Sequence, residues 1–266
     1  MVKDIPITVA FGGGVNSTAM LCGFKERGER PSFITFADTG GEFPRTYDHV
    51  KEMDGLCREW WGVGITRVHK TYQGKFEGLE KNSLRKHLLP SLAYGGPGRK
   101  GCSMKFKVDP QTKALKEWMD KEGVKKVIRC IGYDAGESHR RLDIKEEDLK
   151  KGRIAINRYP LVEWNWRREE CEKALCRTKI ANPGKSACFF CPASRRSEVI
   201  NLKDYHPELL ERALKMEEES RATSKKKLGL GGEGNYWADW VAMDDAQARL
   251  FLDIEPMHKP CDCFGG

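Results

Sequence analysis

Long hydrophobic runs are missing from this 266-residue chain. It has no stretch of about eighteen consecutive apolar residues, which argues against a membrane-spanning helix and a membrane partner. The amino-terminal segment carries a lysine and an acidic residue before the first apolar run, and it lacks the apolar core of a signal peptide. We therefore expect a cytoplasmic protein. No two of the six histidines stand at ligand spacing, which argues against a histidine metal site.

Ten cysteines are the most unusual feature of the composition. Without an export signal, they indicate metal binding or thiol chemistry in a reducing compartment rather than disulfides. The net charge of +8, from 47 basic and 39 acidic residues, suits an anionic partner such as a nucleotide or a nucleic acid. A solvated basic surface is the commoner explanation of such an excess, so the charge alone decides no function.

Apolar runs alternate with segments of helical spacing over the first part of the chain. Strands are expected at 7–11, 33–37, 65–68 and 126–132, and helices at about 17–27, 45–60 and 109–121. This alternation predicts an α/β fold with a doubly wound parallel sheet, Rossmann-like. It stops after residue 160, so we expect a nucleotide-binding α/β domain over 1–160 and a cysteine-rich helical subdomain over 161–266. The basic, glycine-rich region 71–107 is expected to be an active-site loop.

The segment Gly12-Gly13-Gly14-Val15-Asn16-Ser17 follows the first strand and precedes the first helix. Such a turn gathers backbone N–H groups and the positive end of a helix dipole, which favours phosphate binding. Asn16 and Ser17 add side-chain donors, and we expect them to cap the helix. The spacing fits neither the Walker loop nor G-x-G-x-x-G. An ordinary glycine-rich turn is the alternative.

Ligands of parallel sheets bind beyond the carboxyl ends of the strands. Three segments are expected to meet there, namely the glycine loop, Asp38–Gly41 and Gly132–Ser138. Asp38, Thr39, Gly40 and Gly132 are therefore candidate nucleotide-binding residues beside Gly12, Gly13, Gly14, Asn16 and Ser17.

The glycine loop resembles the Ser-Gly-Gly-x-Asp-Ser loop of the PP-loop ATP pyrophosphatases, with Gly12 in the first Ser position and Asn16 in the Asp position. Further segments are similar to the phosphoadenosine phosphosulfate reductase family, a branch of these proteins. Asp38-Thr39-Gly40-Gly41-Glu42-Phe43-Pro44, followed by Tyr47, resembles its Asp-Thr-Gly-x-x-Phe-Pro segment. Its Cys-x-x-x-x-Lys-x-x-Pro segment is matched by Cys102, Lys107 and Pro110. Its Gly-Arg-x-x-x-Glu-Ser-x-x-Arg element is matched by Gly132, Glu137, Ser138 and Arg141, with Tyr133 replacing the first arginine.

The resemblance implies an adenine nucleotide alpha hydrolase-like fold that binds ATP and Mg²⁺ and releases pyrophosphate. Asp38 is the candidate to contact the cation or the ribose, and Lys107 and Arg141 are the candidates to face anionic groups. The chain keeps an intact glycine loop and lacks the Glu-Cys-Gly-Leu-His ending of the sulfonucleotide reductases. It therefore looks closer to the ATP-using members that handle sulfur, such as the DNA phosphorothioation sulfurtransferases and the tRNA thiolases.

The Cys188-Phe189-Phe190-Cys191 turn directs two thiolates at one point, and Cys102 precedes it in the chain. The resemblance suggests a [4Fe–4S] cluster held by Cys102, Cys188 and Cys191, with the fourth iron open or bound by an unassigned cysteine. A zinc site completed by Cys171, Cys176 or His206 is the main alternative, and redox thiols are another. Cys22, Cys57 and Cys130 are expected in the core, as packing residues. Trp164 and Trp166 are expected to be packing anchors.

The reaction implied by the resemblance is adenylation of an acceptor, followed by displacement of AMP by sulfur. The acceptor is expected to be a nucleic acid bound by the basic segments 70–107 and 225–227, and the sulfur donor a protein such as a cysteine desulfurase. One alternative is thiol-dependent reduction of an adenylated sulfate, with Cys261 or Cys263 as nucleophile. A second alternative is a non-catalytic nucleotide-sensing protein with structural zinc.

Overall fold

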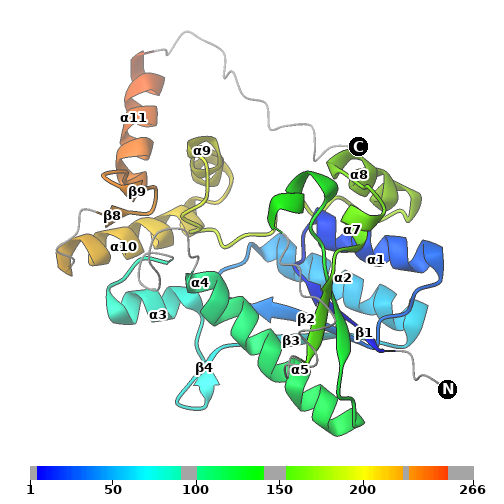
Figure 1. Ribbon diagram of the computed structural model, residues 1–266. Helices are drawn as coiled ribbons and strands as arrows, with labels where there is room; N and C mark the ends of the chain where they lie inside the picture. The colour runs from blue at the N-terminus through cyan, green and yellow to red at the C-terminus, as the bar shows by residue number, and fades with distance from the viewer. Residues whose placement is uncertain (1–4, 91–100, 141–153, 224–227, 251–266) are drawn as a thin grey trace. The chain divides into compact units, whose positions relative to one another are not determined.

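The computed structural model describes residues 5–90, 101–140, 154–223 and 228–250 (Figure 1). The chain divides into two compact units that alternate along the sequence. The first, called the sheet unit here, takes in 1–38, 43–69 and 107–186. The second, called the helical unit, takes in 39–42, 70–106 and 187–266. The predicted domain boundary after residue 160 stays a prediction.

The sheet unit contains a five-stranded sheet in which every neighbouring pair of strands is parallel. Its order is β3-β2-β1-β6-β7. The strands are β1 (Ile7–Phe11), β2 (Phe33–Asp38), β3 (Ile65–His69), β6 (Val127–Ile131) and β7 (Ala155–Arg158). The helices are α1 (Val15–Arg27), α2 (Pro44–Trp61), α5 (Asp109–Glu122), α7 (Pro160–Glu163) and α8 (Arg168–Arg177), with a 3₁₀-helix at Ala135–Arg140.

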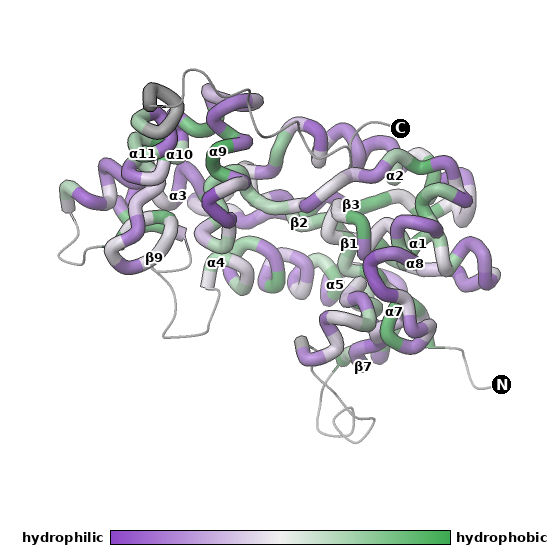
Figure 2. Tube along the Cα trace, turned by 90° about the horizontal axis from the view of Figure 1, so that it is seen from above, coloured by the Kyte–Doolittle hydropathy of each residue, from purple (hydrophilic) through white to green (hydrophobic). Residues whose placement is uncertain are grey.

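Alternate residues of the strands point to opposite faces of this sheet, and each face packs against helices. Val9 and Phe11 of β1 belong to the larger hydrophobic core, together with residues of α1, α2 and α8. On the opposite face, Leu115 and Met119 of α5 pack with Val127. Figure 2 shows hydrophobic residues gathered along the central strands, with hydrophilic residues alternating along the helices. The predicted α/β fold with a parallel sheet is confirmed, and helices on both faces are consistent with a Rossmann-like doubly wound fold.

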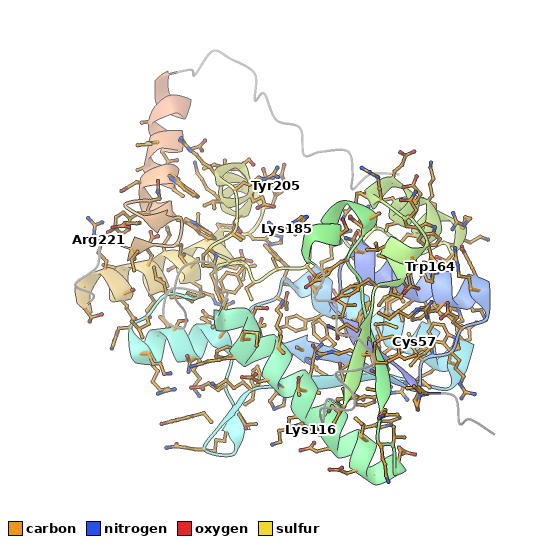
Figure 3. The ribbon with its side chains drawn as sticks, viewed as in Figure 1. Cys57, Lys116, Trp164, Lys185, Tyr205 and Arg221 are labelled. Atoms are coloured by element: carbon orange, nitrogen blue, oxygen red, sulfur yellow. The ribbon has the colours of Figure 1, made fainter. Side chains whose placement is uncertain are left out.

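Packing residues of the sheet unit lie where the sequence predicts them. Cys22, Cys57 and Cys130 are buried, and burial raises the pKa of their thiols to about 11, 12 and 12. The Trp164 ring contacts Phe24 edge-on, with ring centroids 5.7 Å apart. Figure 3 labels Cys57 and Trp164. These residues therefore stabilise the fold and are not candidates for the site.

The helical unit is built mainly from α9 (Arg196–Tyr205), α10 (Pro207–Thr223) and α11 (Trp237–Leu250). The buried Glu217 carboxylate of α10 accepts backbone N–H bonds from Leu230, Trp237 and Ala238 at 2.7, 3.0 and 3.1 Å. The last two of these donors belong to the first turn of α11, where a helix has no acceptor of its own. The unit's other elements are β4 (Thr71–Tyr72), β5 (Lys75–Phe76), α3 (Leu79–Lys86), α4 (Gly101–Ser103), β8 (Leu228–Gly229) and β9 (Gly232–Glu233).

Region 71–107 differs from the expected loop. Residues 71–86 form a two-stranded antiparallel hairpin followed by α3, and a π-helix spans Met104–Val108. Strands of two residues are too short to show any hydrophobic period, so the sequence pattern does not reveal the hairpin. Among the residues described, no helix has the length and apolar character that crossing a bilayer requires.

Candidate functional site

The carboxyl ends of β1, β2 and β6 lie side by side, because β1 pairs with β2 on one side and with β6 on the other. The chain runs outward from β1 to β3 in one direction and from β6 to β7 in the other. This is the point where the strand order reverses, and open α/β sheets bind their ligands beyond the strand ends there. The glycine loop, Asp38 and the segment after β6 all begin at this edge.

The glycine loop turns sharply between β1 and α1, and Gly13 makes the turn. Its φ is +73°, and a Cβ added to it would lie 3.2 Å from Thr46 Cγ2 and 3.3 Å from the Phe36 ring. An alanine here would therefore meet both backbone strain and crowding. Gly14 is the N-cap of α1, with Asn16 and Ser17 in its first turn, which corrects the expectation that these two residues cap the helix.

The first turn of α1 presents donors toward this edge of the sheet. A helix leaves its first N–H groups without an acceptor in the helix, and these groups bind anions. The Ser17 hydroxyl holds the turn, because it accepts the Gly14 N–H at 3.3 Å and donates to the Gly14 carbonyl at 3.0 Å. A Cβ added to Gly14 would lie 2.9 Å from Ser186 Oγ, so the Ser186 hydroxyl lies close to the glycine loop.

Gly132 brings the end of β6 against α1. A Cβ added to Gly132 would lie 2.9 Å from Ser17 Cα and 3.0 Å from Ser17 N, both backbone atoms. Only a residue without a side chain permits this approach. The predicted site residue Gly132 therefore allows the first turn of α1 to lie close against the end of β6.

Asn16 joins the glycine loop to two carboxylates that follow β6. Its Nδ2 donates to Asp134 Oδ2 and to Glu137 Oε2, each at 3.0 Å. Within the described parts of the chain, the buried Asn16 Oδ1 accepts no hydrogen bond. Rotating the amide by 180° exchanges its oxygen and nitrogen, so that Oδ1 faces the carboxylates. Three oxygen donors would then converge, and oxygen ligands are those that Mg²⁺ prefers.

Asp38 is buried at the end of β2, and its carboxylate engages two neighbours. Oδ1 accepts from the Tyr47 hydroxyl at 2.8 Å, and Oδ2 accepts from Arg67 Nη2 and Nε at 2.6 and 2.9 Å. The Arg67 guanidinium also lies over the Tyr47 ring, 4.7 Å from its centroid. Asp38 and Tyr47 thus fix the direction of a half-exposed guanidinium. The expected contact of Asp38 with a cation or a ribose stays a prediction.

A buried histidine, His49, is linked to the glycine loop through Thr18. His49 Nε2 lies 2.9 Å from Thr18 Oγ1, and the Thr18 hydroxyl donates to the Gly14 carbonyl at 3.0 Å. The threonine oxygen therefore accepts the Nε2–H of His49. Burial, aided by the nearby Arg45 charge, lowers the His49 pKa to about 4. The imidazole is neutral at physiological pH and holds the N-cap of α1 in place.

In the helical unit, the Thr39–Glu42 segment pairs with the cysteine turn. Glu42 and Cys188 form an antiparallel bridge, and the Thr39 hydroxyl lies 3.1 Å from both Cys188 Sγ and Glu42 Oε1. Cys191 N–H closes the turn on the Cys188 carbonyl at 3.0 Å. The Thr39–Glu42 part of the resemblance motif thus contacts Cys188 directly.

Cys102 lies on α4 of the same unit. In the portion of the chain that the structure describes, no three His, Cys, Asp or Glu side chains are grouped so that they could hold a metal ion. The structure therefore does not assemble Cys102, Cys188 and Cys191 as a metal centre, and their role as cluster ligands stays a prediction. Zinc stays open in the same way.

Other predicted residues fall outside this geometry. Lys107 lies in the π-helix before α5. Arg141, residues 225–227, Cys261 and Cys263 lie outside the described residues. Cys171, a possible zinc ligand, is buried in the core of the sheet unit, and burial raises its pKa to about 12.

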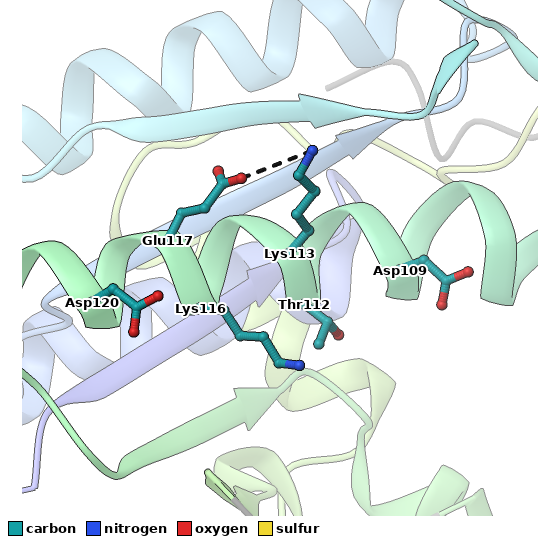
Figure 4. Close-up of a pocket in the computed structure, with 6 residues that line it drawn as sticks. All are labelled: Asp109, Thr112, Lys113, Lys116, Glu117 and Asp120. Atoms are coloured by element: carbon teal, nitrogen blue, oxygen red, sulfur yellow. Dashed lines mark ion pairs between the residues drawn. The ribbon is translucent and has the colours of Figure 1, made fainter. Parts of the chain in front are cut away.

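A hollow of about 370 Å³ lies along the exposed side of α5 (Figure 4). Its charges are of both signs, and Lys113 Nζ pairs with Glu117 Oε1 at 3.9 Å. It is lined by Asp109, Thr112, Lys113, Lys116, Glu117 and Asp120. None of these is a predicted site residue, so the hollow adds nothing to the candidate site.

Three residues of this edge escaped the sequence analysis as site residues: Arg67, Asp134 and Ser186. Arg67 lies within β3, and nothing in the local sequence links it to its partner Asp38, which is 29 residues away. Asp134 lies inside the segment 132–138 expected at this edge, and an acidic residue in that segment was the available signal. For Ser186 the sequence offers no comparable signal.

No protein-family model matches the chain. The chain is similar to uncharacterized protein MJ0066 of Methanocaldococcus jannaschii, with 26% identity over 219 residues. The match covers 78% of this chain and 40% of that protein, so the chain spans less than half the length of its relative.

Proposed function

We propose that the protein is a PP-loop ATP pyrophosphatase of the phosphoadenosine phosphosulfate reductase-like family that adenylates an acceptor and then transfers sulfur to it. The observation that carries this proposal is the glycine loop at the reversal point of the sheet, with Asp134 and Glu137 hydrogen-bonded to its Asn16. At this point of the sheet, the backbone N–H groups that would bind phosphates lie next to the side-chain oxygen atoms that would bind a cation. Both are needed to bind a nucleoside triphosphate with its metal.

The residues of the sheet unit have distinct roles in this proposal. The first-turn amides of α1 and the hydroxyls of Ser17 and Ser186 bind the phosphates. Asn16, Asp134 and Glu137 would hold Mg²⁺, which would supply charge neutralisation. Arg67 faces anionic groups from β3, with Asp38 as the residue that positions it. These preorganised charges stabilise the transition state in which an acceptor oxygen attacks the α-phosphate and pyrophosphate leaves.

The sulfur step is assigned to the helical unit. The terminal sulfur of a cysteine persulfide displaces AMP from the adenylated acceptor, so that a carbon–sulfur bond forms as the carbon–oxygen bond breaks. A second cysteine thiolate then attacks the inner sulfur, which breaks the sulfur–sulfur bond, releases the thiolated acceptor and leaves a disulfide that an external thiol reduces. Cys188 is the first candidate to carry the persulfide, because its Sγ lies 3.1 Å from the Thr39 hydroxyl and it is part of the Cys-x-x-Cys turn. A separate sulfur donor, such as a cysteine desulfurase, reloads it. An iron–sulfur cluster on Cys102, Cys188 and Cys191 is the alternative use of these thiols, in which Cys188 would be a ligand and would not carry the sulfur.

The test is nucleotide binding by calorimetry with Mg²⁺ and ATP, together with pyrophosphate release in the presence of nucleic acid acceptors. Gly13→Ala should weaken ATP binding about 10- to 100-fold, because displaced amides lose charge-assisted hydrogen bonds. Gly28→Ala is the matched control. Gly28 has a similar φ of +67° at the end of α1, but a Cβ there meets no atom within 4 Å.

Gly28→Ala should therefore bind ATP as the unaltered protein does. Equal losses of affinity in the two variants would refute the role given to the loop. ATP binding without pyrophosphate release in the presence of any acceptor would support the nucleotide-sensing alternative instead.

A further inference from the structure

The hairpin of the helical unit is exposed and has a tight turn. Residues 71–76 are all exposed, and β4 and β5 are joined by the two residues Gln73 and Gly74. Their φ values of +50° and +74° are those of the two-residue turn that fits the twist of a hairpin. The hairpin is labelled β4 in Figure 1. It is therefore an ordered arm in a region that the sequence marks only as basic and glycine-rich.

Each face of this arm carries an aromatic ring. Tyr72 pairs with Lys75 and Phe76 with Thr71, so the two rings point to opposite faces. Tyr72 is 45% exposed and Phe76 is 44% exposed. Such exposure of two large rings on six residues is a feature that folding alone does not require.

The Tyr72 ring is already stacked on one side by a cation. The Arg85 guanidinium lies 4.2 Å from the ring centroid, and Glu77 Oε1 accepts from Arg85 Nη2 and Nε at 2.6 and 3.1 Å. The buried Glu77 fixes the plane of the guanidinium. The Arg85 guanidinium and the Tyr72 ring therefore form a stack, on which a further planar group can stack.

Phe76 packs against the segment that contacts the cysteine turn. A Cβ added to Gly40 would lie 2.9 Å from Phe76 Cζ, so the ring packs on the Gly40 backbone. The residue before Gly40 is Thr39, whose hydroxyl lies 3.1 Å from Cys188 Sγ. The Thr39–Gly40 segment is therefore in contact with both the Phe76 ring and the Cys188 thiol.

Basic residues outnumber acidic residues around the arm. Both acidic residues of the stretch are paired, Glu77 with Arg85 and Glu80 with Arg212 at 2.5 Å. The basic residues of the stretch are Lys70, Lys75, Lys81, Arg85 and Lys86. Aromatic faces interleaved with cations suit bases and phosphates better than an ordinary protein surface.

We propose that the β4–β5 hairpin binds a single-stranded stretch of nucleic acid, with bases stacked on Tyr72 and Phe76 and phosphates on Lys70 and Lys75. The stretch must be single-stranded, because a duplex hides the faces of its bases. This inference rests on the proposed function in that it identifies the acceptor class. The binding itself requires neither ATP nor turnover.

The experiment measures fluorescence anisotropy of labelled 20-nucleotide single-stranded RNA and DNA, and of a matched duplex, without ATP. Tyr72→Ala and Phe76→Ala should each weaken single-strand binding about 5- to 150-fold. Lys75→Ala should reduce the slope of log affinity against log salt by about 0.7. The matched control is Tyr205→Ala, an aromatic that is 52% exposed on α9 of the same unit and is labelled in Figure 3. It should bind as the unaltered protein does.

Circular dichroism and melting temperature establish that each variant is folded. Unchanged single-strand binding by both hairpin variants, or equal affinity for the duplex, would overturn the inference and leave the arm as a contact for a protein. The proposed function fails separately. Gly13→Ala should lose ATP binding and keep oligonucleotide binding, whereas Tyr72→Ala should do the reverse.

Discussion

Replacing Asn16 with aspartate should make the stability of the protein depend on a divalent cation. In the unaltered protein, the Asn16 amide donates two hydrogen bonds of 3.0 Å to Asp134 and Glu137. Aspartate removes both donors and adds a third negative charge. Hydrogen bonds to charged groups contribute about 1.5 kcal/mol or more each, so the loss is about 3 kcal/mol. For a chain of this size, that corresponds to roughly 6–12 °C in melting temperature.

The assay is thermal unfolding of Asn16→Asp in a chelator and in a Mg²⁺ titration, with Asn16→Ala as the matched control. Both variants should melt lower than the unaltered protein in the chelator. Mg²⁺ should restore Asn16→Asp, because three carboxylates hold the cation, and should raise Asn16→Ala much less. Equal responses of the two variants to Mg²⁺, or an undisturbed melting temperature in the chelator, would refute the convergence of the three side chains on one cation.

Two further predictions concern stability. Because the His49 pKa is lowered to about 4 from 6.5, the unfolded chain binds a proton between these values that the folded protein does not, so stability falls as pH decreases through this window. This histidine should make the unaltered protein about 2 kcal/mol less stable at pH 5 than at pH 7.5, and His49→Gln should remove that contribution. Urea unfolding at the two pH values measures it, and the same pH dependence in His49→Gln would contradict the burial argument. Glu217→Gln should lower the free energy of unfolding by about 2–4 kcal/mol, since its carboxylate accepts three backbone N–H groups, whereas the exposed Glu218→Gln should change it by less than about 0.5 kcal/mol. Similar effects of the two glutamate substitutions would contradict the role of that carboxylate.

The sheet was predictable because its strands are local signals. Ile7–Phe11 is an apolar run followed by three glycines, and the helix after it ends at Gly28, as the sequence predicts. The ends of these elements differ by one or two residues from the predicted ones, as at β2, which continues to Asp38. That extra residue places the Asp38 carboxylate at the edge of the sheet.

The partnerships within the site were not predictable, because they join residues that are far apart in sequence. Asn16 and Asp134 are separated by 118 residues, and only the pairing of β1 with β6 brings them together. The neutral state of His49 depends on burial that its own helix does not reveal. The N-cap fell on Gly14 instead of Asn16 or Ser17, because the Ser17 hydroxyl folds back on the Gly14 backbone.

The path of the chain also limits how this protein can be taken apart in the laboratory. It passes from one compact unit to the other after residues 38, 42, 69, 106 and 186. Neither unit is a continuous stretch of polypeptide, so no single truncation yields one of them with all its segments. Dissection by fragments would remove strands along with the feature under study, and point substitutions in the intact chain are the appropriate tool.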